Sequence, residues 1–247
     1  MGWTRDGDRM LMSPTARRWA SAIILVASFL YVSPAQSFPP YRSTDADTSA
    51  PNTVELRLGL VEVEREDRDD KVTTPLVRLN LGLPGHAEFV TELEYVPRDE
   101  RLGDAAVGVK WAPIRGAPAL GVETLALLPV RADDRGLGLE GQLLATLEGE
   151  SAVLHVNGGG FLDPRSSPTE AGWRASALVE LPLSGIRPGF EAFAKQQFGD
   201  SVDARIGVGA IVSLGRFDLR AGVHAGVTPE APDVSLSLWL GTKFSAW

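Results

Sequence analysis

The stretch Asp233–Phe244, D-V-S-L-S-L-W-L-G-T-K-F, decides the fold that we expect for the chain. From Val234 to Leu240 every second side chain is apolar, the opposite face is mostly polar, and Phe244 closes the apolar row. A period of two residues is typical of a β-strand with one apolar face. The rest of the chain is interpreted from this strand.

Almost every segment from Thr53 onward repeats the same alternation, about twelve times in all. The 26 glycines and 17 prolines are spread along the chain, as expected of many strands separated by turns. We predict strands over Val54–Glu64, Thr74–Leu83, Ala87–Val96, Gly103–Trp111, Ala119–Leu128, Leu137–Leu147, Ala152–Phe161, Trp173–Leu183, Gly189–Phe198, Ala204–Leu214, Phe217–Val227 and Val234–Phe244.

Charged side chains occupy the faces opposite these apolar rows. In a solid core each charge would need a partner or would cost several kcal/mol, whereas a water-filled lumen removes that cost. We therefore predict an all-β fold, an up-and-down antiparallel transmembrane β-barrel of about twelve strands with lipid outside and a polar lumen inside. The residues that we expect to line the lumen include Arg57, Arg78, Glu88, Glu92, Lys110, Glu123, Glu140, His155, Arg205, Arg220, His224 and Lys243.

Acidic and basic residues are unevenly divided between these inward faces. The third to sixth predicted strands carry mostly acids, with Lys110 as the main exception, and the last three and first two strands carry most of the bases. One interpretation is a field across the pore that orients polar or aromatic solutes. The other is that the charges pair directly in so narrow a barrel and stiffen or plug it. The acids are Glu88, Glu92, Glu94, Asp104, Glu123 and Glu140, and the bases are Arg57, Arg78, Arg205, Arg220 and Lys243.

The N-terminus has the order of a secretory signal peptide. Two arginines precede the apolar run 19–32, and S-P-A over 33–35 supplies the small residues of a cleavage site. We predict a signal peptide over residues 1–35, with an uncleaved membrane anchor as the alternative. Residues 36–52 are polar, contain proline and lack periodicity, so we predict a flexible leader there and a barrel over 53–247.

The composition limits the kinds of partner that we expect for this chain. The chain has 24 basic and 32 acidic residues and a net charge of −8 at pH 7, and it becomes more acidic once residues 1–35 are removed. Nucleic acid is therefore not an expected partner. The absence of cysteine excludes disulfides and thiolate metal sites. We expect the outer membrane of a Gram-negative-type cell as the location, with its lipid bilayer, small solutes and the barrel-assembly machinery as partners.

The links between the predicted strands alternate in character. Charged links such as R-E-D-R-D-D-K-V over 65–72 alternate with mostly shorter ones such as G-R over 215–216. Outer-membrane barrels have short periplasmic turns and longer external loops, so both termini are expected on the periplasmic side. The expected aromatic girdles then hold Phe89, Trp111, Phe190, Phe217 and Phe244 at the periplasmic ends and Tyr95, Trp173 and Phe198 at the external ends.

Several segments carry a resemblance to a known family. They are T-P-L-V-R-L-N-L-G-L (Thr74–Leu83), L-G-D-A-A-V-G-V-K-W (Leu102–Trp111), P-A-L-G-V-E-T-L-A-L-L-P (Pro118–Pro129), L-H-V-N-G-G-G (Leu154–Gly160) and the aromatic-ended last strand. In this order they resemble the outer-membrane transporter-like family associated with the meta pathway of phenol degradation. The resemblance implies an outer-membrane β-barrel that passes small organic molecules and needs no cofactor.

We predict no catalytic, cofactor or metal site. The letters G-L-G-L-E-G over 136–141 match the dinucleotide fingerprint, but that motif works only where a strand hands over to a helix, and here it begins a strand. The three histidines lack the companion ligands of a zinc motif. A hydrolase that pairs His155 or His224 with Ser176 or Ser235 has no G-x-S-x-G turn to support it.

We therefore expect a passive channel for small molecules, with aromatic compounds and organic acids as candidate solutes, and no enzymatic activity. The alternative is a non-conducting barrel with a structural or surface-interaction role, in which the acidic loops Glu66–Asp70 and Asp99–Arg101 would make the contacts. A barrel hydrolase is the third interpretation.

Overall fold

The computed structural model describes residues 40–66, 69–97, 101–130 and 136–245. The predicted signal peptide over 1–35 lies outside these ranges, and the side chains of the two acidic loops, Glu66–Asp70 and Asp99–Arg101, are not described either. Within the described ranges, no helix is long and apolar enough to cross a membrane.

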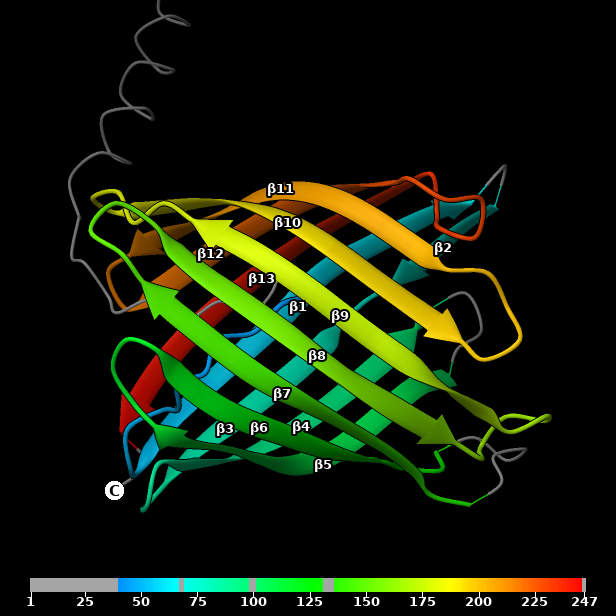
Figure 1. The fold of residues 1–247 in the computed structure, drawn as a ribbon, viewed down its shortest axis with the longest axis horizontal. Coiled ribbons are helices and arrows are strands. Elements are labelled where there is room, and N and C mark those ends of the chain that lie inside the picture. The colour runs from blue at the N-terminus through cyan, green and yellow to red at the C-terminus, as the bar shows by residue number, and fades with distance from the viewer. Residues whose placement is uncertain (1–39, 67–68, 98–100, 131–135, 246–247) are drawn as a thin grey trace, which may run out of the picture.

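Strands form most of the described chain and close into a barrel (Figure 1). Thirteen strands are present, and twelve of them make up the wall, because β2 pairs only with the last residues of β1 and β3 pairs with the earlier ones. Each wall strand is antiparallel to its neighbours, and β13 pairs with β1 to close the barrel. The strands are β1 (Thr53–Glu66), β2 (Asp69–Thr73), β3 (Leu76–Leu83), β4 (Ala87–Val96), β5 (Arg101–Ile114), β6 (Ala119–Leu127), β7 (Gly138–Glu148), β8 (Val153–Asp163), β9 (Glu170–Glu180), β10 (Ile186–Gln197), β11 (Asp203–Leu214), β12 (Phe217–Gly226) and β13 (Val234–Ser245).

The predicted fold class is confirmed, and the predicted strands match the wall strands with small shifts at their ends. Two details differ. The first link was expected to be a loop, but β1 runs on to Glu66 and forms a hairpin with β2. In addition, the β1–β13 register shifts between Gly59 and Val61, which marks a β-bulge in β1.

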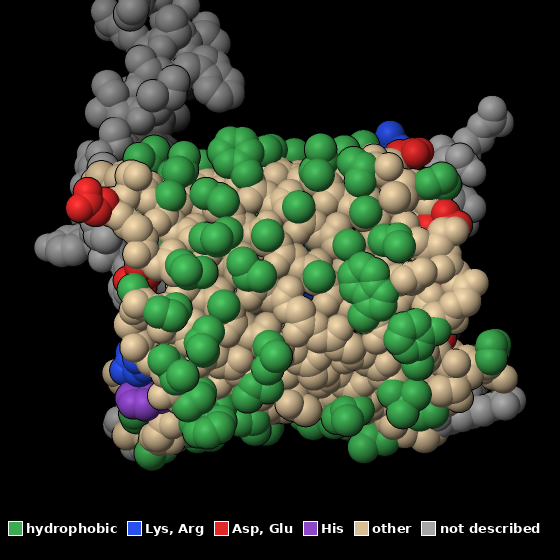
Figure 2. Space-filling model, in the orientation of Figure 1, with side chains coloured by type: hydrophobic (Ala, Val, Ile, Leu, Met, Phe, Trp, Pro, Cys, Tyr) green, Lys and Arg blue, Asp and Glu red, His purple; other side chains and the backbone are tan. Residues whose placement is uncertain are grey.

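The polarity of the barrel is inverted relative to a soluble protein. Buried side chains include charged groups such as Glu55, Arg78 and Arg220, whereas Leu143 on the outer face of β7 is 71% exposed. Figure 2 shows apolar side chains spread over the wall, with acidic and basic side chains mainly near its two ends. An apolar outer surface around a polar interior is the arrangement required for a barrel that crosses a lipid bilayer.

The links define two ends of the barrel. One end carries the links 84–86, 115–118, 149–152, 181–185 and 215–216, and we call it the short-turn end. The opposite end carries mostly longer links, among them 128–137 and 227–233, and we call it the long-loop end. Of the aromatic residues assigned to the girdles, Phe217 and Phe244 lie at the short-turn end, and Tyr95 and Phe198 lie at the long-loop end.

The segment before β1 differs from the flexible leader that we expected over 36–52. From Pro40 onward it is described, and most of the residues 40–49 are buried inside the barrel. The segment passes into the wall at the short-turn end, where the amide of Asn52 donates to the carbonyl of Gly82 over 3.0 Å. Its polar composition resembles a disordered linker because its partners are the polar side chains of the lumen rather than an apolar core.

We predict that Leu143→Arg, on the lipid face near the middle of β7, lowers the unfolding free energy of the barrel in a bilayer by about 2–4 kcal/mol, because a charge at the bilayer midplane is costly. Leu162→Arg, at the long-loop end of β8, is the matched control and should cost only about 0–1 kcal/mol. Urea unfolding in lipid vesicles measures both values. Equal costs for the two variants would contradict the placement of the bilayer around the wall.

Candidate functional site: a plugged lumen below an acidic vestibule

Residues 40–49 form a plug inside the lumen. Ser43 and Thr44 are fully buried, and Tyr41, Asp45 and Ala46 are nearly so. The segment pairs with no strand of the wall, so its backbone groups need other partners. The wall supplies them as side chains.

Asn157 of β8 both accepts a hydrogen bond from the main chain of the plug and donates one to it. Its side-chain oxygen accepts from the amide of Thr44 over 2.7 Å, and its side-chain nitrogen donates to the carbonyl of Thr44 over 2.8 Å. Two further amides follow the same pattern, since Ala46 donates to Thr146 Oγ1 over 2.8 Å and Ser49 donates to Glu88 over 2.6 Å. These bonds take the place of strand pairing.

Glu191 of β10 holds the inner part of the plug. Its carboxylate accepts from the amides of Arg42 and Ser43 over 2.9 and 2.5 Å, and from the Ser43 hydroxyl over 2.6 Å. His224 Nε2 lies 2.7 Å from the same carboxylate. A buried carboxylate with this many donors is well solvated by the protein itself.

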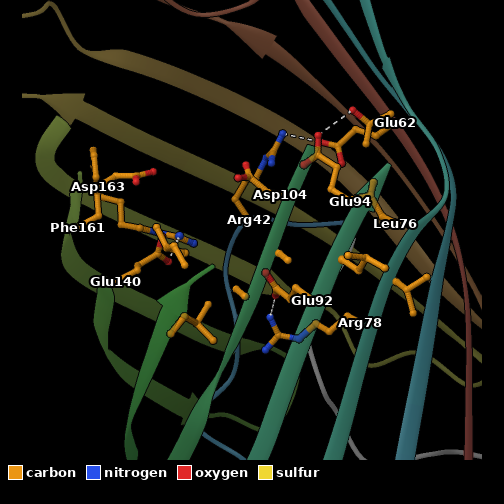
Figure 3. Close-up of a pocket in the computed structure, with 18 of the residues that line it drawn as sticks. Arg42, Glu62, Leu76, Arg78, Glu92, Glu94, Asp104, Glu140, Phe161 and Asp163 are labelled. Atoms are coloured by element: carbon orange, nitrogen blue, oxygen red, sulfur yellow. Dashed lines mark hydrogen bonds and ion pairs between the residues drawn. The ribbon is translucent and has the colours of Figure 1, made fainter. Parts of the chain in front are cut away.

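Ion pairs complete the attachment. Lys110 Nζ lies 2.6 Å from Asp45 Oδ1, with both side chains nearly fully buried. At the inner end of the plug, one nitrogen of the Arg42 guanidinium lies 2.7 Å from Glu62 and 2.9 Å from Glu64 (Figure 3). The plug therefore neutralises charges on separate strands of the wall, Lys110 on β5 and the two glutamates on β1.

Glycines in β10, β11 and β12 make room for the plug. A Cβ atom on Gly189 would lie 2.6 Å from the hydroxyl of Tyr41, and one on Gly222 would lie 2.7 Å from Cβ of Pro40. A Cβ on Gly209 would lie 2.9 Å from both residues. A larger residue at any of these positions would require the plug residues Pro40 or Tyr41, or the wall beside them, to shift.

The basic residues that we expected in the lumen are buried in ion pairs. Arg78 bonds to Glu92 of β4 and lies 2.8 Å from Glu123 of β6. Glu55 is shared by three cations, with Arg57 at 2.7 Å, Arg220 at 3.2 Å and Lys243 at 3.6 Å. In the structure these charges pair directly rather than facing each other across open water.

Neither of the two lumen histidines is hydrogen-bonded to Ser176 or Ser235, although His224 lies opposite Ser235 in the pairing of β12 with β13. His155 Nδ1 lies 3.0 Å from Thr146 Oγ1, and its Nε2 lies 3.5 Å from Glu180. Ser176 donates to Asn157, and Ser235 accepts from Arg205. Among the described residues, no cluster of three or more histidine or carboxylate side chains could hold a metal ion.

A cavity of about 460 Å³ lies between the plug and the long-loop end, and we call it the vestibule. Tyr41 and Arg42 of the plug contribute to its floor, and Asp104 at its rim is more than half exposed. Nine carboxylates and five basic side chains of the described chain line it, so acid is in excess. The acids are Glu62, Glu64, Glu92, Glu94, Asp104, Glu123, Glu140, Asp163 and Glu170, and the bases are Arg42, Arg78, Arg165, Arg174 and Lys195.

The bases of the vestibule are held against its walls. Arg174 bonds to Glu140, and Lys195 lies over the ring of Phe161 at 4.7 Å from its centroid. Arg165, in the loop after β8, bonds to Asp163 and Asp104, and the hydrogen bonds to Asp163 raise the pKa of its guanidinium above the usual value. Figure 3 shows the carboxylates of Glu62, Glu92 and Glu94 on the side of the cavity formed by β1, β3 and β4.

Several residues of this site were missed in the sequence analysis, among them Glu62, Glu64 and Glu191. Strict alternation from Arg57 would place Glu62 and Glu64 on the outer face, but the bulge between Gly59 and Val61 turns them inward. Glu191 follows the alternation of β10. Since Phe190 was expected on the outer face, where it is indeed exposed, the alternation would have placed Glu191 in the lumen.

Comparisons with known proteins leave the family open, because no family model and no curated protein matches the sequence. Among the similar solved structures is a porin with 12% identity and a TM-score of 0.43, over 69% of this chain and 62% of the porin, so the chain spans less than two thirds of that protein. Another is the translocator domain of the autotransporter NalP from Neisseria meningitidis, with 13% identity and a TM-score of 0.47 over 93% of this chain and 95% of that one. A third is a loop-deletion mutant of OmpT, an outer membrane protein of Vibrio cholerae, with 10% identity and a TM-score of 0.34 over 78% of this chain and 100% of that one. At these identities and scores the likenesses carry no argument about function.

We predict that Asn157→Leu loosens the plug. The variant removes both hydrogen bonds to Thr44, each worth about 0.5–1.5 kcal/mol. Exchange of the amide hydrogens of Thr44 and Ala46 should become about tenfold faster or more, while exchange in β8 and β9 stays slow. Hydrogen exchange followed by mass spectrometry measures this effect.

The matched control is Gln142→Leu, because Gln142 is also a buried lumen amide but bonds to Glu123 and not to the plug. It should leave exchange of the plug amides unchanged. Equal acceleration in the two variants would mean that the loss of any lumen amide loosens the whole interior, which contradicts a specific attachment through Asn157.

Proposed function

We propose that the protein is an outer-membrane channel that its own N-terminal segment closes, and that small polar solutes diffuse through the lumen when this segment moves out. The observation that carries the proposal is the plug itself. It is a polar segment held in a polar lumen by side-chain hydrogen bonds and ion pairs, with a solvent-reaching vestibule beyond it. The apolar outer surface of the wall supports placement in a membrane.

The wall tolerates departure of the plug for two reasons. The plug contributes no strand, so the hydrogen bonds between the wall strands stay intact without it. Lys110, which pairs with Asp45 in the closed state, also has Glu88 and Glu123 beside it on the adjacent strands β4 and β6. Water that enters the lumen can solvate the remaining groups, as in a polar pore.

The resemblance of the sequence to the transporter-like family of phenol degradation supports small organic molecules as solutes. The acid excess of the vestibule favours neutral or cationic solutes over organic acids, because carboxylates repel anions and low-dielectric walls strengthen the repulsion. The signal peptide predicted over 1–35 and the expected role of the barrel-assembly machinery belong to the same proposal.

A non-conducting structural barrel is the second candidate, and the observation that favours it is the density of buried ion pairs. The pairs Arg78–Glu123 and Arg220–Glu55 join strands that are not neighbours in the wall, and they stiffen the lumen even where the plug is not in contact. Conductance distinguishes the two candidates.

We predict that Asp45→Ala increases the fraction of time that a single channel is open in a planar bilayer, by about tenfold or more. The variant leaves the buried Lys110 without its closest carboxylate when the plug is seated, whereas water can reach Lys110 when the plug is out. Asp47→Ala is the matched control in the same segment, since Asp47 is partly exposed and lies 3.6 Å from the exposed Arg115.

The measurement is single-channel conductance of the mature chain and both variants, after folding is verified by a heat-dependent gel shift. Rare openings of the wild type, frequent openings of Asp45→Ala and no change in Asp47→Ala are expected. Silence from all three correctly folded proteins would reject the channel and favour the structural barrel.

A further inference from the structure

The vestibule already holds a guanidinium group. The side chain of Arg42 reaches from the plug to Glu62 and Glu64 of β1 and bonds to both carboxylates, at 2.7 and 2.9 Å, while about a third of it stays exposed to the cavity. Charge-assisted bonds of this kind are among the stronger hydrogen bonds in proteins. These two carboxylates are therefore a cation site that is occupied by a group of the same chain.

Occupation of this site is coupled to the seating of the plug. The amide of Arg42 and the amide of the next residue, Ser43, both bond to Glu191 on the other side of the lumen. A guanidinium from solution that took the place of Arg42 at Glu62 would remove one end of this attachment. The plug would then be held by its remaining contacts alone.

The charge balance changes when Arg42 leaves. Glu64 keeps its ion pair with Arg205 at 2.6 Å, whereas the ion pair that the structure gives Glu62 is the one with Arg42. The vestibule would then present its nine carboxylates against four bases. A soluble cation is thus bound more tightly by the unplugged state than by the plugged state, which is the condition for a ligand to shift an equilibrium.

We propose that the vestibule binds a small organic cation, with a guanidinium or primary ammonium group seated between Glu62 and Glu64 in place of Arg42, and that this binding promotes release of the plug. The cavity of about 460 Å³ lies within the range of small-molecule sites. Phe161, whose ring already lies against Lys195 at 4.7 Å, offers an aromatic face for the rest of such a ligand. The release step rests on the proposed channel function, but the binding step does not.

The test uses agmatine, which carries one guanidinium and one ammonium group, and the mature chain in lipid nanodiscs. Calorimetry measures its affinity, and hydrogen exchange of the Thr44 and Ala46 amides measures release of the plug. We expect saturable binding, and exchange of both amides about tenfold faster at saturation. N-butylurea, a neutral probe of similar shape, should do neither.

Three variants locate the site. Glu62→Gln combined with Glu64→Gln should weaken agmatine binding about tenfold to hundredfold, because charge-assisted hydrogen bonds are lost. Arg42→Ala should tighten it about tenfold, because the competing guanidinium is gone. Glu148→Gln combined with Glu150→Gln, in exposed positions at the short-turn end, is the control pair and should leave binding unchanged.

The outcomes distinguish failure of cation binding, failure of plug release and failure of the proposed channel. Absence of binding to the folded wild type and to Arg42→Ala, or equal weakening by the control pair, would overturn the cation site. Binding without faster amide exchange would overturn the coupling to the plug. Binding with faster exchange, but no conductance in any variant, would reject the channel and leave the cation site and its coupling standing.

Discussion

The structure depends on one constraint, which is that charges enclosed by a narrow barrel must find partners in place of bulk water. The wall of twelve strands meets it in two ways. Within the wall, Glu55 gathers three cations from β1, β12 and β13. The plug supplies further partners, as Asp45 does for Lys110 at 2.6 Å. The plug is therefore part of the electrostatic balance of the lumen, and not only an obstacle in it.

This balance differs on the two sides of the plug. Toward the short-turn end, carboxylates such as Glu88 accept hydrogen bonds from the plug or from neighbouring side chains and are nearly fully buried. Toward the long-loop end, the vestibule has more carboxylates than bases and reaches solvent at Asp104. A solute arriving from the long-loop end meets an acidic cavity first and the Arg42 guanidinium at its floor. In the proposed channel, solute binding and pore closure would therefore involve the same ion pair, Arg42 with Glu62 and Glu64.

The fold could be predicted from the sequence because each wall strand must place apolar side chains toward lipid and polar side chains toward the lumen. These two requirements together produce the alternation. Strands such as Ala87–Val96 were predicted to the residue, and the even number of wall strands followed from counting. The plug could not be predicted, because residues 40–49 have no periodicity of their own. Their order comes from side chains such as Asn157 and Glu191, which lie more than a hundred residues away in the chain. The same is true of Glu62, whose inward direction depends on a single-residue bulge.

In the proposed channel, both interpretations of the lumen charges would apply to one barrel. In the plugged state Arg78, Arg220 and Lys110 all lie in ion pairs. Departure of residues 40–49 would take away Arg42 and Asp45 and raise the acid excess of the vestibule, while Arg205 and Arg220 keep their ion pairs with carboxylates of β1. The field across the pore would then be a property of the open state, created by removal of the segment that had neutralised it. Direct pairing within the wall would therefore persist in both states of the proposed channel, and the open state would add to it a field from the vestibule carboxylates that the plug no longer neutralises.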